Sequence, residues 1–153
     1  MLTRDVLDLI AATGTAAEGA DLFRGLQPDE PDACVTVTEY GGGPPVALFG
    51  EPVALERPRV QIRARGEAND YDGPAQRLQL LYLRLAELGA VTVNRTRYLA
   101  FEPVQQPFPL GKDTNERWVF AVNFAVTREP TRHLLVDGVD AARVASTERG
   151  VQS

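Results

Sequence analysis

The sequence predicts an α+β fold: a single mixed, mostly antiparallel β-sheet with helices packed on one face, a long inter-strand arm and a hairpin. Two patterns support this prediction. Apolar residues recur at helical spacing near the N-terminus and again after residue 70, whereas alternation of apolar and polar residues marks several strands. The order of these segments is helix, strand, arm, strand, helix and then three strands.

Both helices are predicted from apolar residues that fall on one side of a helix. The first runs from Leu2 to about Ala12. The stronger one lies within residues 69–88, where Asp70 or Asp72 is expected to cap the first turn. Residues 16–26 are expected to add a short helical turn that carries two further apolar side chains.

The strands are predicted from a period of two. Residues 34–40 alternate valine with threonine, and residues 59–65 place arginine and glutamine opposite small apolar residues. Residues 117–127 put five large apolar side chains on one face, which predicts the central core strand. Shorter strands are expected at residues 90–93 and 97–103. The sheet should therefore have an apolar face under the helices and a polar face on the other side.

Two long connections have no obvious place in the core. Residues 41–55 are rich in glycine and proline and carry one aromatic side chain, Phe49, so we expect an arm that lies across a neighbouring subunit. Residues 105–116 predict a hairpin with Phe108 near its tip. An exposed aromatic on a loop often anchors an interface, but Phe108 could equally fold back on the sheet.

Length and charge define the class of protein. The chain has 153 residues, which predicts one domain at 1–128 and a C-terminal extension at 129–153 that is flexible when the protein is alone. The net charge is −5, the sum of −7 for residues 1–57 and +2 for residues 58–153. An acidic chain is a poor candidate for tight DNA binding, and no apolar run is long enough to predict a membrane span.

No catalytic, metal or cofactor site is predicted. Cys34 is the only cysteine and is expected in the core, and His133 is the only histidine. The segment PLGKDT lacks the first glycine of a phosphate-binding loop. The carboxylates Asp70, Asp72 and Asp113 could form an acid/base or metal cluster, although helix capping and turn formation are their more common roles.

Several short motifs together resemble a known family. They are TEYGGGPP followed by Phe-Gly, the basic strand that ends in RARG, the helix that follows Asp70, and the hairpin QPFPLGKD before an aromatic strand. This set resembles the phage minor capsid proteins grouped with the tail terminators of long-tailed, siphovirus-type bacteriophages. The similarity extends from about Cys34 to Thr127.

The resemblance implies a structural virion protein and no enzyme. It would form a ring, with six subunits expected, that terminates the tail tube and joins it to the head connector or stopper protein. Its partners would be further copies of itself, the tail tube protein and that connector, with genomic DNA passing through without specific binding and no membrane involved. It would act at the head–tail junction of the virion after assembly in the host cytoplasm.

Three alternatives remain open at this point. Another head–tail connector component, such as a head-completion or adaptor protein, would share most of these features. A small enzyme or ligand-binding domain is disfavoured because no constellation of His, Ser and Cys is available. A nucleic-acid regulator is disfavoured by the net charge.

Two sets of surface residues are expected to matter for assembly. The predicted interface residues, taken from the arm, the basic strand and the hairpin, are Phe49, Arg63, Arg65, Phe108, Pro109, Leu110, Lys112 and Asp113. The predicted channel-lining residues, whose negative charge would keep DNA mobile, are Asp21, Asp29, Glu30 and Asp32. The alternative is that these acids only keep the free protein soluble.

Overall fold

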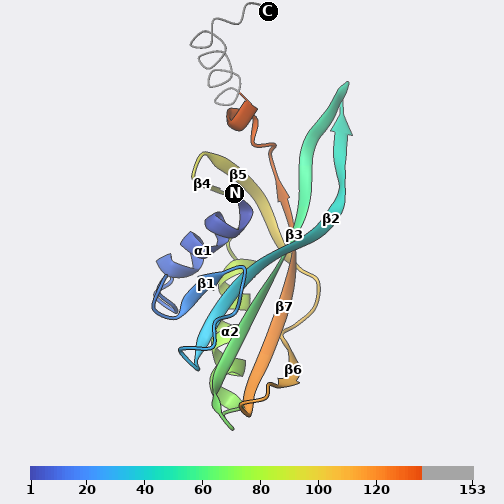
Figure 1. Cartoon of the computed structure of the whole chain (residues 1–153). Coiled ribbons are helices and arrows are strands. Elements are labelled where there is room, and N and C mark those ends of the chain that lie inside the picture. The colour runs from blue at the N-terminus through green and yellow to red at the C-terminus, as the bar shows by residue number, and fades with distance from the viewer. Residues whose placement is uncertain (136–153) are drawn as a thin grey trace, which may run out of the picture.

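The structure is a computed structural model that describes residues 1–135. This part of the chain contains seven strands and two long helices (Figure 1). The elements are α1 (Leu2–Ala12), β1 (Leu22–Arg24), β2 (Cys34–Leu48), β3 (Glu51–Ala68), α2 (Asp72–Ala86), β4 (Val91–Val93), β5 (Thr96–Pro103), β6 (Phe108–Lys112) and β7 (Arg117–Arg128). The predicted fold class is confirmed, because these elements form one mixed sheet in an α+β arrangement.

The sheet is centred on β3 and β7. Its strand order is β1-β2-β3-β7-β5-β4, and β6 pairs with β7 outside this path. Only β1 and β2 run parallel; the other pairings are antiparallel. Val37 lies opposite Ile62, which in turn lies opposite Val122. Because side chains alternate along each strand, this register collects the apolar residues on one face.

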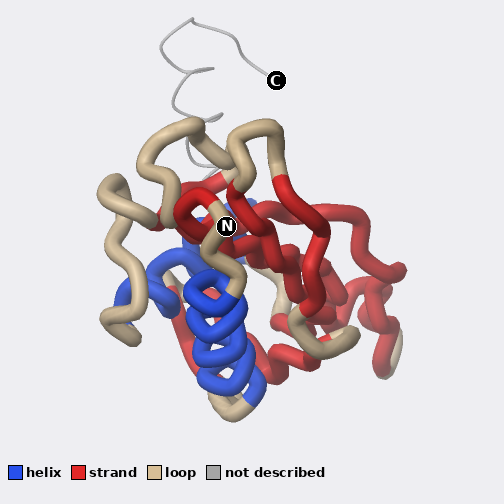
Figure 2. The backbone as a smooth tube through the Cα atoms, turned by 90° about the horizontal axis from the view of Figure 1, so that it is seen from below, coloured by secondary structure: helices blue, strands red, loops and turns tan. Residues whose placement is uncertain are grey.

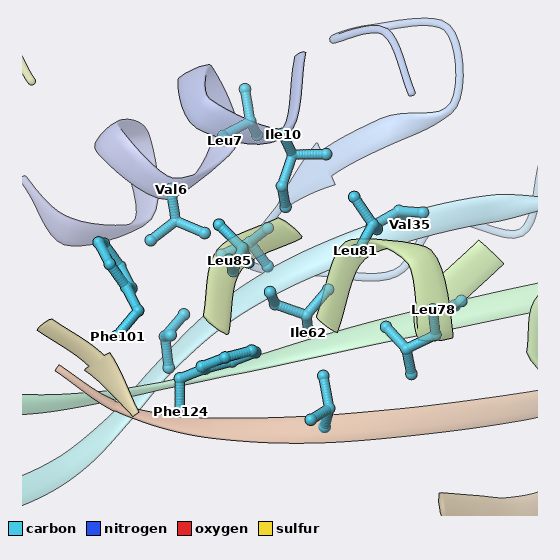
Figure 3. Close-up of a cluster of buried hydrophobic side chains, with 14 of the residues drawn as sticks. Val6, Leu7, Ile10, Val35, Ile62, Leu78, Leu81, Leu85, Phe101 and Phe124 are labelled. Carbon is cyan, nitrogen blue, oxygen red and sulfur yellow. The ribbon is translucent and has the colours of Figure 1, made fainter. Parts of the chain in front are cut away.

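Both helices cover this apolar face (Figure 2). The leucines of α2 that point to the sheet are fully or almost fully buried, as are four apolar residues of α1 (Figure 3). The first helix has the predicted bounds, and the second is capped as predicted, because the Gly73 amide donates to Asp70 Oδ1 at 3.0 Å. The helix residues in the core are Leu2, Val6, Leu7, Ile10, Leu78, Leu81 and Leu85.

The helical turn predicted for residues 16–26 is wrong. The segment contains β1, whose Leu22 is fully buried and pairs in register with Val35 of β2. Gly19 and Gly25 have φ values of 80° and 88°, so the chain turns sharply on both sides of this strand. Such left-handed positions end a helix, which explains why the apolar residues here enter the sheet instead.

The predicted arm is a paired β-hairpin and not a loop, which corrects the sequence-based interpretation. β2 and β3 remain paired as far as Leu48 and Glu51, with register shifts along the way, and the hairpin projects from the end of the sheet (Figure 1). A Cβ at Gly42 would lie 2.2 Å from the Arg57 carbonyl oxygen, so this close approach of the two strands requires glycine. The prolines 44–45 are tolerated because β1 covers only residues 35–37 of the outer edge of β2.

The second predicted hairpin forms, but its tip lies elsewhere. Phe108 begins β6 and lies opposite Ala121 of β7, and the turn is made by residues 113–116. Phe108 is half-buried, which agrees with the alternative that it folds back on the sheet. The placement of Phe108 near the hairpin tip is therefore wrong, because the backbone pairs with β7 five residues before the turn.

The chain leaves the sheet at the end of β7 and runs along the hairpin formed by β2 and β3. The guanidinium of Arg132 donates to the Val53 carbonyl oxygen at 2.7 Å and lies 3.6 Å from the Glu51 carboxylate. The start of the predicted extension thus contacts the arm. Most of that extension, including its predicted flexibility, lies outside the described residues.

Candidate assembly surfaces

The hairpin of residues 41–55, called the arm from here on, is the most exposed apolar feature of the described chain. Its tip carries Leu48, which is 45% exposed, and Phe49, which is fully exposed at 103%. Between Gly41 and Leu55 the only charged residue is Glu51. A projecting apolar hairpin gains little from its own subunit, so this surface is suited to contact with another protein.

The turn at the arm tip holds its aromatic residue in an unfavourable backbone conformation. Phe49 has φ 48° and Gly50 has φ 82°, which is the sign pattern of a type I′ hairpin turn. Asn or Gly is favoured at the first of these positions, whereas a bulky side chain there costs on the order of 1–3 kcal/mol. Phe49 has no packing within its own subunit that would offset this cost.

The base of the arm is tied to the rest of the sheet by charged residues. Arg128, at the end of β7, is buried and its Nε lies 3.4 Å from Glu56 Oε1. The two residues line a hollow of about 320 Å³ together with Glu39 and Arg57. The hollow thus contains two acids and two bases, so its charge favours neither an anion nor a cation.

Arg65 does not face a neighbouring subunit as expected. Its side chain is 4% exposed, and its guanidinium donates to the carbonyl oxygens of Asp32, at 2.9 Å, and of Pro28, at 2.6 Å. Residues 29 and 31 accept from the same guanidinium. The residue is therefore internal: it holds the acidic loop of residues 27–33, called the acidic loop below, against the sheet. The alternating pattern placed Arg65 on the polar face correctly but gave no sign that the loop covers it.

Arg117 of β7 holds the same loop from a second side. Its Nη1 donates to the Asp29 carbonyl oxygen at 2.6 Å and to Asp32 Oδ1 at 2.9 Å, and its Nε donates to Asp113 Oδ2 at 2.7 Å. Burial alone would lower the pKa of Arg117, but hydrogen bonds to Asp113 and Asp32 raise it above its ordinary value. Two buried arginines thus fix a loop that has no regular secondary structure of its own.

The four predicted channel acids divide into two pairs. Asp21 accepts from the Ala17 amide and forms an ion pair with Arg77 of α2, and Asp32 is engaged by Arg117. Asp29 is 97% exposed in its side chain, although one oxygen lies 3.9 Å from Arg117, and Glu30 is exposed. Two of the four therefore have structural partners inside the subunit, and the prediction of a channel wall now depends on the other two.

The sheet face opposite the helices is polar at its centre, as predicted. Arg63 donates to Gln61 Oε1 at 2.7 Å, and Gln61 donates to Asn123 Oδ1 at 3.0 Å. All three side chains are half-buried, and the row crosses from β3 to β7. Arg63 retains partial exposure, so it is available to a partner in a way that its neighbour Arg65 is not.

The hairpin of β6 and β7 presents a smaller surface than the sequence suggests. Pro109 is exposed and Leu110 is 48% exposed, so both remain available for contact. Lys112 donates to Asn69 Oδ1 at 3.0 Å and lies 5.7 Å from the Trp118 ring centroid. Asp113 is bound to Arg117 within the same chain. Lys112 and Asp113, the two charged interface residues predicted on this hairpin, thus anchor it to its own subunit.

The groups with chemical reactivity have structural roles in the described residues. Cys34 is fully buried, and burial raises the pKa of its thiol, which makes it a poor nucleophile. No group of three His, Cys, Asp or Glu side chains within residues 1–135 could hold a metal ion. Asp70 caps α2 and Asp113 closes the β6–β7 turn, which are the common roles considered for them.

One buried polar cluster was missed by the sequence interpretation. Asp5 of α1 is fully buried and accepts hydrogen bonds from the Tyr98 hydroxyl and from Asn94 Nδ2, the latter at 2.8 Å. Burial, and after it the Asp5 carboxylate, raise the pKa of Tyr98 far above its ordinary value. The cluster fixes the start of α1 to the β4–β5 turn. Acidic residues are common in the first turn of a helix because they interact favourably with its dipole, so Asp5 gave no sign of a buried cluster in the sequence.

α2 carries a further exposed surface that was not predicted from the sequence. Leu80 and Leu83 are 42% and 44% exposed on the side of the helix that faces away from the sheet. No helix within residues 1–135 is long and apolar enough to cross a membrane. Exposed leucines on a folded helix of this kind indicate a possible protein contact.

Comparison with known families places these surfaces in context. The family model of the bacteriophage tail terminator protein matches residues 9–130, which is well over half of the chain. The match includes the acidic loop, the arm, α2 and the hairpin of β6 and β7. No curated protein matches the chain.

Proposed function

Because the chain belongs to the bacteriophage tail terminator family, we propose that it forms a ring, with six subunits, that closes the tail tube and joins it to the head connector. The family makes the protein a structural component of the phage tail or neck, and hence of the virion. The proposal adds the ring, its partners and its place at the head–tail junction, after assembly in the host cytoplasm.

The exposed arm is the observation that carries this proposal. It projects from the body, has an apolar tip with a fully exposed Phe49, and places that residue in an unfavourable backbone conformation. These features lower the stability of an isolated subunit and make sense in an assembly where the tip is covered. A ring of identical subunits supplies such a cover, because each copy offers its arm to the next.

The hairpin of β6 and β7 and the polar sheet face are the proposed contacts with the tube or the connector. Pro109 and Leu110 offer an exposed apolar edge on β6, and Arg63 offers a partly exposed guanidinium on β3, on the other side of β7. Arginine suits fixed, bidentate contacts with carboxylates of a partner. Lys112 and Asp113 act indirectly, since they hold the hairpin in place.

The wall of the channel is proposed to carry Asp29 and Glu30. Both lie on the exposed side of the acidic loop, which Arg65 and Arg117 hold in a fixed position. Negative charge on a channel wall keeps DNA from binding, because no phosphate is neutralised and no counterions are released. Salt would screen the repulsion over ~8 Å at physiological ionic strength.

Electron microscopy of tails assembled with and without this chain tests the ring. We expect tubes that end in one ring of the protein on the head-proximal side, and uncapped tubes of uneven length when the chain is omitted. A variant with both Leu48 and Phe49 replaced by serine should fold but leave tubes uncapped, whereas Val104→Ser, which changes a similarly exposed side chain elsewhere, should not. A chain found only on the head side of the connector would instead support an adaptor and overturn the proposal.

A further inference from the structure

The outer side of α2 carries an apolar groove with no partner in the described chain. Gln76, Gln79, Leu80 and Leu83 follow one another at helical spacing, and with Ala75 they line a shallow groove of about 480 Å³. None of these five residues is charged. The core is filled by other leucines on the opposite side of α2, so the packing of the subunit does not require this stripe.

The arm tip is a protruding apolar surface that could fill this apolar groove. It presents two protruding apolar side chains, Leu48 and Phe49, and one negative charge, Glu51, whose side chain is 63% exposed although its carboxylate lies 3.6 Å from Arg132 of the same chain. The groove is shallow and apolar, and the next residue of α2 after Leu83 is the exposed Arg84. The two surfaces are thus complementary in apolar character and in charge.

The two surfaces lie on separate parts of one molecule. The arm tip is at the start of β3, whereas α2 begins only after the far end of this 18-residue strand, and the arm points away from the body (Figure 1). A contact between unlike surfaces of identical chains is heterologous, and repeated copies of it close into a ring or extend into a filament. This favours a second copy of the chain as the occupant of the groove.

We propose that the arm tip of one subunit docks into the α2 groove of the next, with Phe49 between Leu80 and Leu83 and with Glu51 near Arg84. The inference deepens the proposed ring and rests on it. Phe49 would bury roughly 150–250 Å² of its own surface, which is a small part of the ~1,200–2,000 Å² of a stable interface. The contact therefore contributes to an interface completed by other surfaces and does not by itself make a stable dimer.

Cysteine cross-linking of the assembled full-length chain tests this contact. A chain with Phe49→Cys and Leu83→Cys should give a ladder of covalent oligomers with a short bis-maleimide, and Phe49→Cys with Leu80→Cys should give the same. Cys34 is fully buried and stays unreactive. The matched control joins Phe49→Cys with Val104→Cys, a similarly exposed position on a loop, and Phe49→Cys alone reports tip-to-tip contact.

The outcomes separate this contact from the ring itself. A ladder with both α2 variants and none with the controls supports the docking. Rings that are visible by electron microscopy but give no ladder overturn the docking and leave the proposed function standing. A ladder with Phe49→Cys alone also overturns it, since the tips would then meet each other. Failure to form rings with wild-type chain and the tail tube protein overturns the proposed function together with the contact.

Discussion

The arm and the acidic loop are both rich in proline, yet they are ordered in opposite ways. The arm is a paired hairpin with register shifts, and most of its residues are exposed. The acidic loop has no regular secondary structure, but carbonyl oxygens of residues 28, 29, 31 and 32 accept hydrogen bonds from buried arginines. Strand pairing of the backbone and attachment to the core are thus separate properties. The arm has the first, and the acidic loop has the second.

The two regions differ because the polar groups of their backbones have different hydrogen-bond partners. In the arm, pairing across the hairpin at Gly43, Val46 and Leu48 satisfies backbone groups, and the side chains remain free for another molecule. In the acidic loop such groups are satisfied by Arg65 and Arg117, which reach the loop from β3 and β7. Changes to the arginines should therefore affect stability, whereas changes to the arm tip should affect assembly.

The largest effect is expected for Arg65→Met. Loss of the buried guanidinium leaves four carbonyl oxygens of the acidic loop without this donor, so the free energy of unfolding should fall by about 3 kcal/mol. Urea unfolding measures this loss, and hydrogen exchange should rise in the acidic loop but not in the arm. Arg63→Met is the matched control on the same strand; with one hydrogen bond to Gln61 it should lose no more than about 1 kcal/mol. Equal losses in the two variants would contradict the proposed role of Arg65.

A smaller effect of the same kind is expected at acid pH for Asp113. Burial alone would raise its pKa, but hydrogen bonds from Arg117 and from the Asn115 amide lower it below the ordinary 3.8. Because the folded-state pKa is the lower one, this carboxylate stabilises the fold above pH ~4. That contribution is lost as the pH falls through the folded-state pKa.

The variant Asp113→Asn measures how much this carboxylate contributes to stability. It should lower the free energy of unfolding by about 1 kcal/mol at pH 7 and make the loss between pH 4 and 2 shallower than in wild type, as measured by urea unfolding at each pH. Asp72→Asn is the control, since Asp72 lies exposed in the first turn of α2. A wild-type and an Asp113→Asn curve with the same slope at acid pH would show that this ion pair contributes nothing.

The elements built on periodicity could be predicted from the sequence. The valines of β2 and the aromatic residues of β7 alternate without interruption, so their strands and their shared apolar face followed directly. α1 was predicted from Leu2 to about Ala12, and the structure gives the same bounds. β1 was not predicted, since three residues are too few to show a period and each parallel partner lies thirteen residues away.

The candidate site was predictable only where exposure follows from composition. Phe49 was singled out because glycine and proline surround it, and the structure does place it in the open. Arg65 and Lys112 were misjudged because their partners come from distant segments: Pro28 is 37 residues from Arg65 in the sequence, and Asn69 is 43 residues from Lys112. An arginine in an alternating strand looks the same in sequence whether it faces water or is covered by a loop. Leu80 and Leu83 were overlooked because a helix rich in leucine gives no sign of which leucines remain outside.

The smallest effect, and one of opposite sign, is expected for Phe49→Asn at the arm tip. Asparagine with the following Gly50 suits a turn in which both residues have positive φ, so the change relieves an unfavourable backbone conformation without removing any packing within the subunit. The free energy of unfolding of the isolated chain should rise by about 1 kcal/mol, and Tm by roughly 2–4 °C for a chain of this size.

The Phe49→Asn variant should also form fewer rings, because the aromatic side chain that would enter a neighbouring subunit is gone. Calorimetry and electron microscopy of one preparation measure both quantities. Leu110→Asn, at an apolar position on β6 that is 48% exposed, should not raise Tm, since no positive φ is relieved there. A Phe49→Asn chain that is less stable than wild type would mean that the aromatic ring packs within its own subunit. The contrast between the anchored acidic loop and the free arm would then not hold for Phe49, the most exposed residue of the arm.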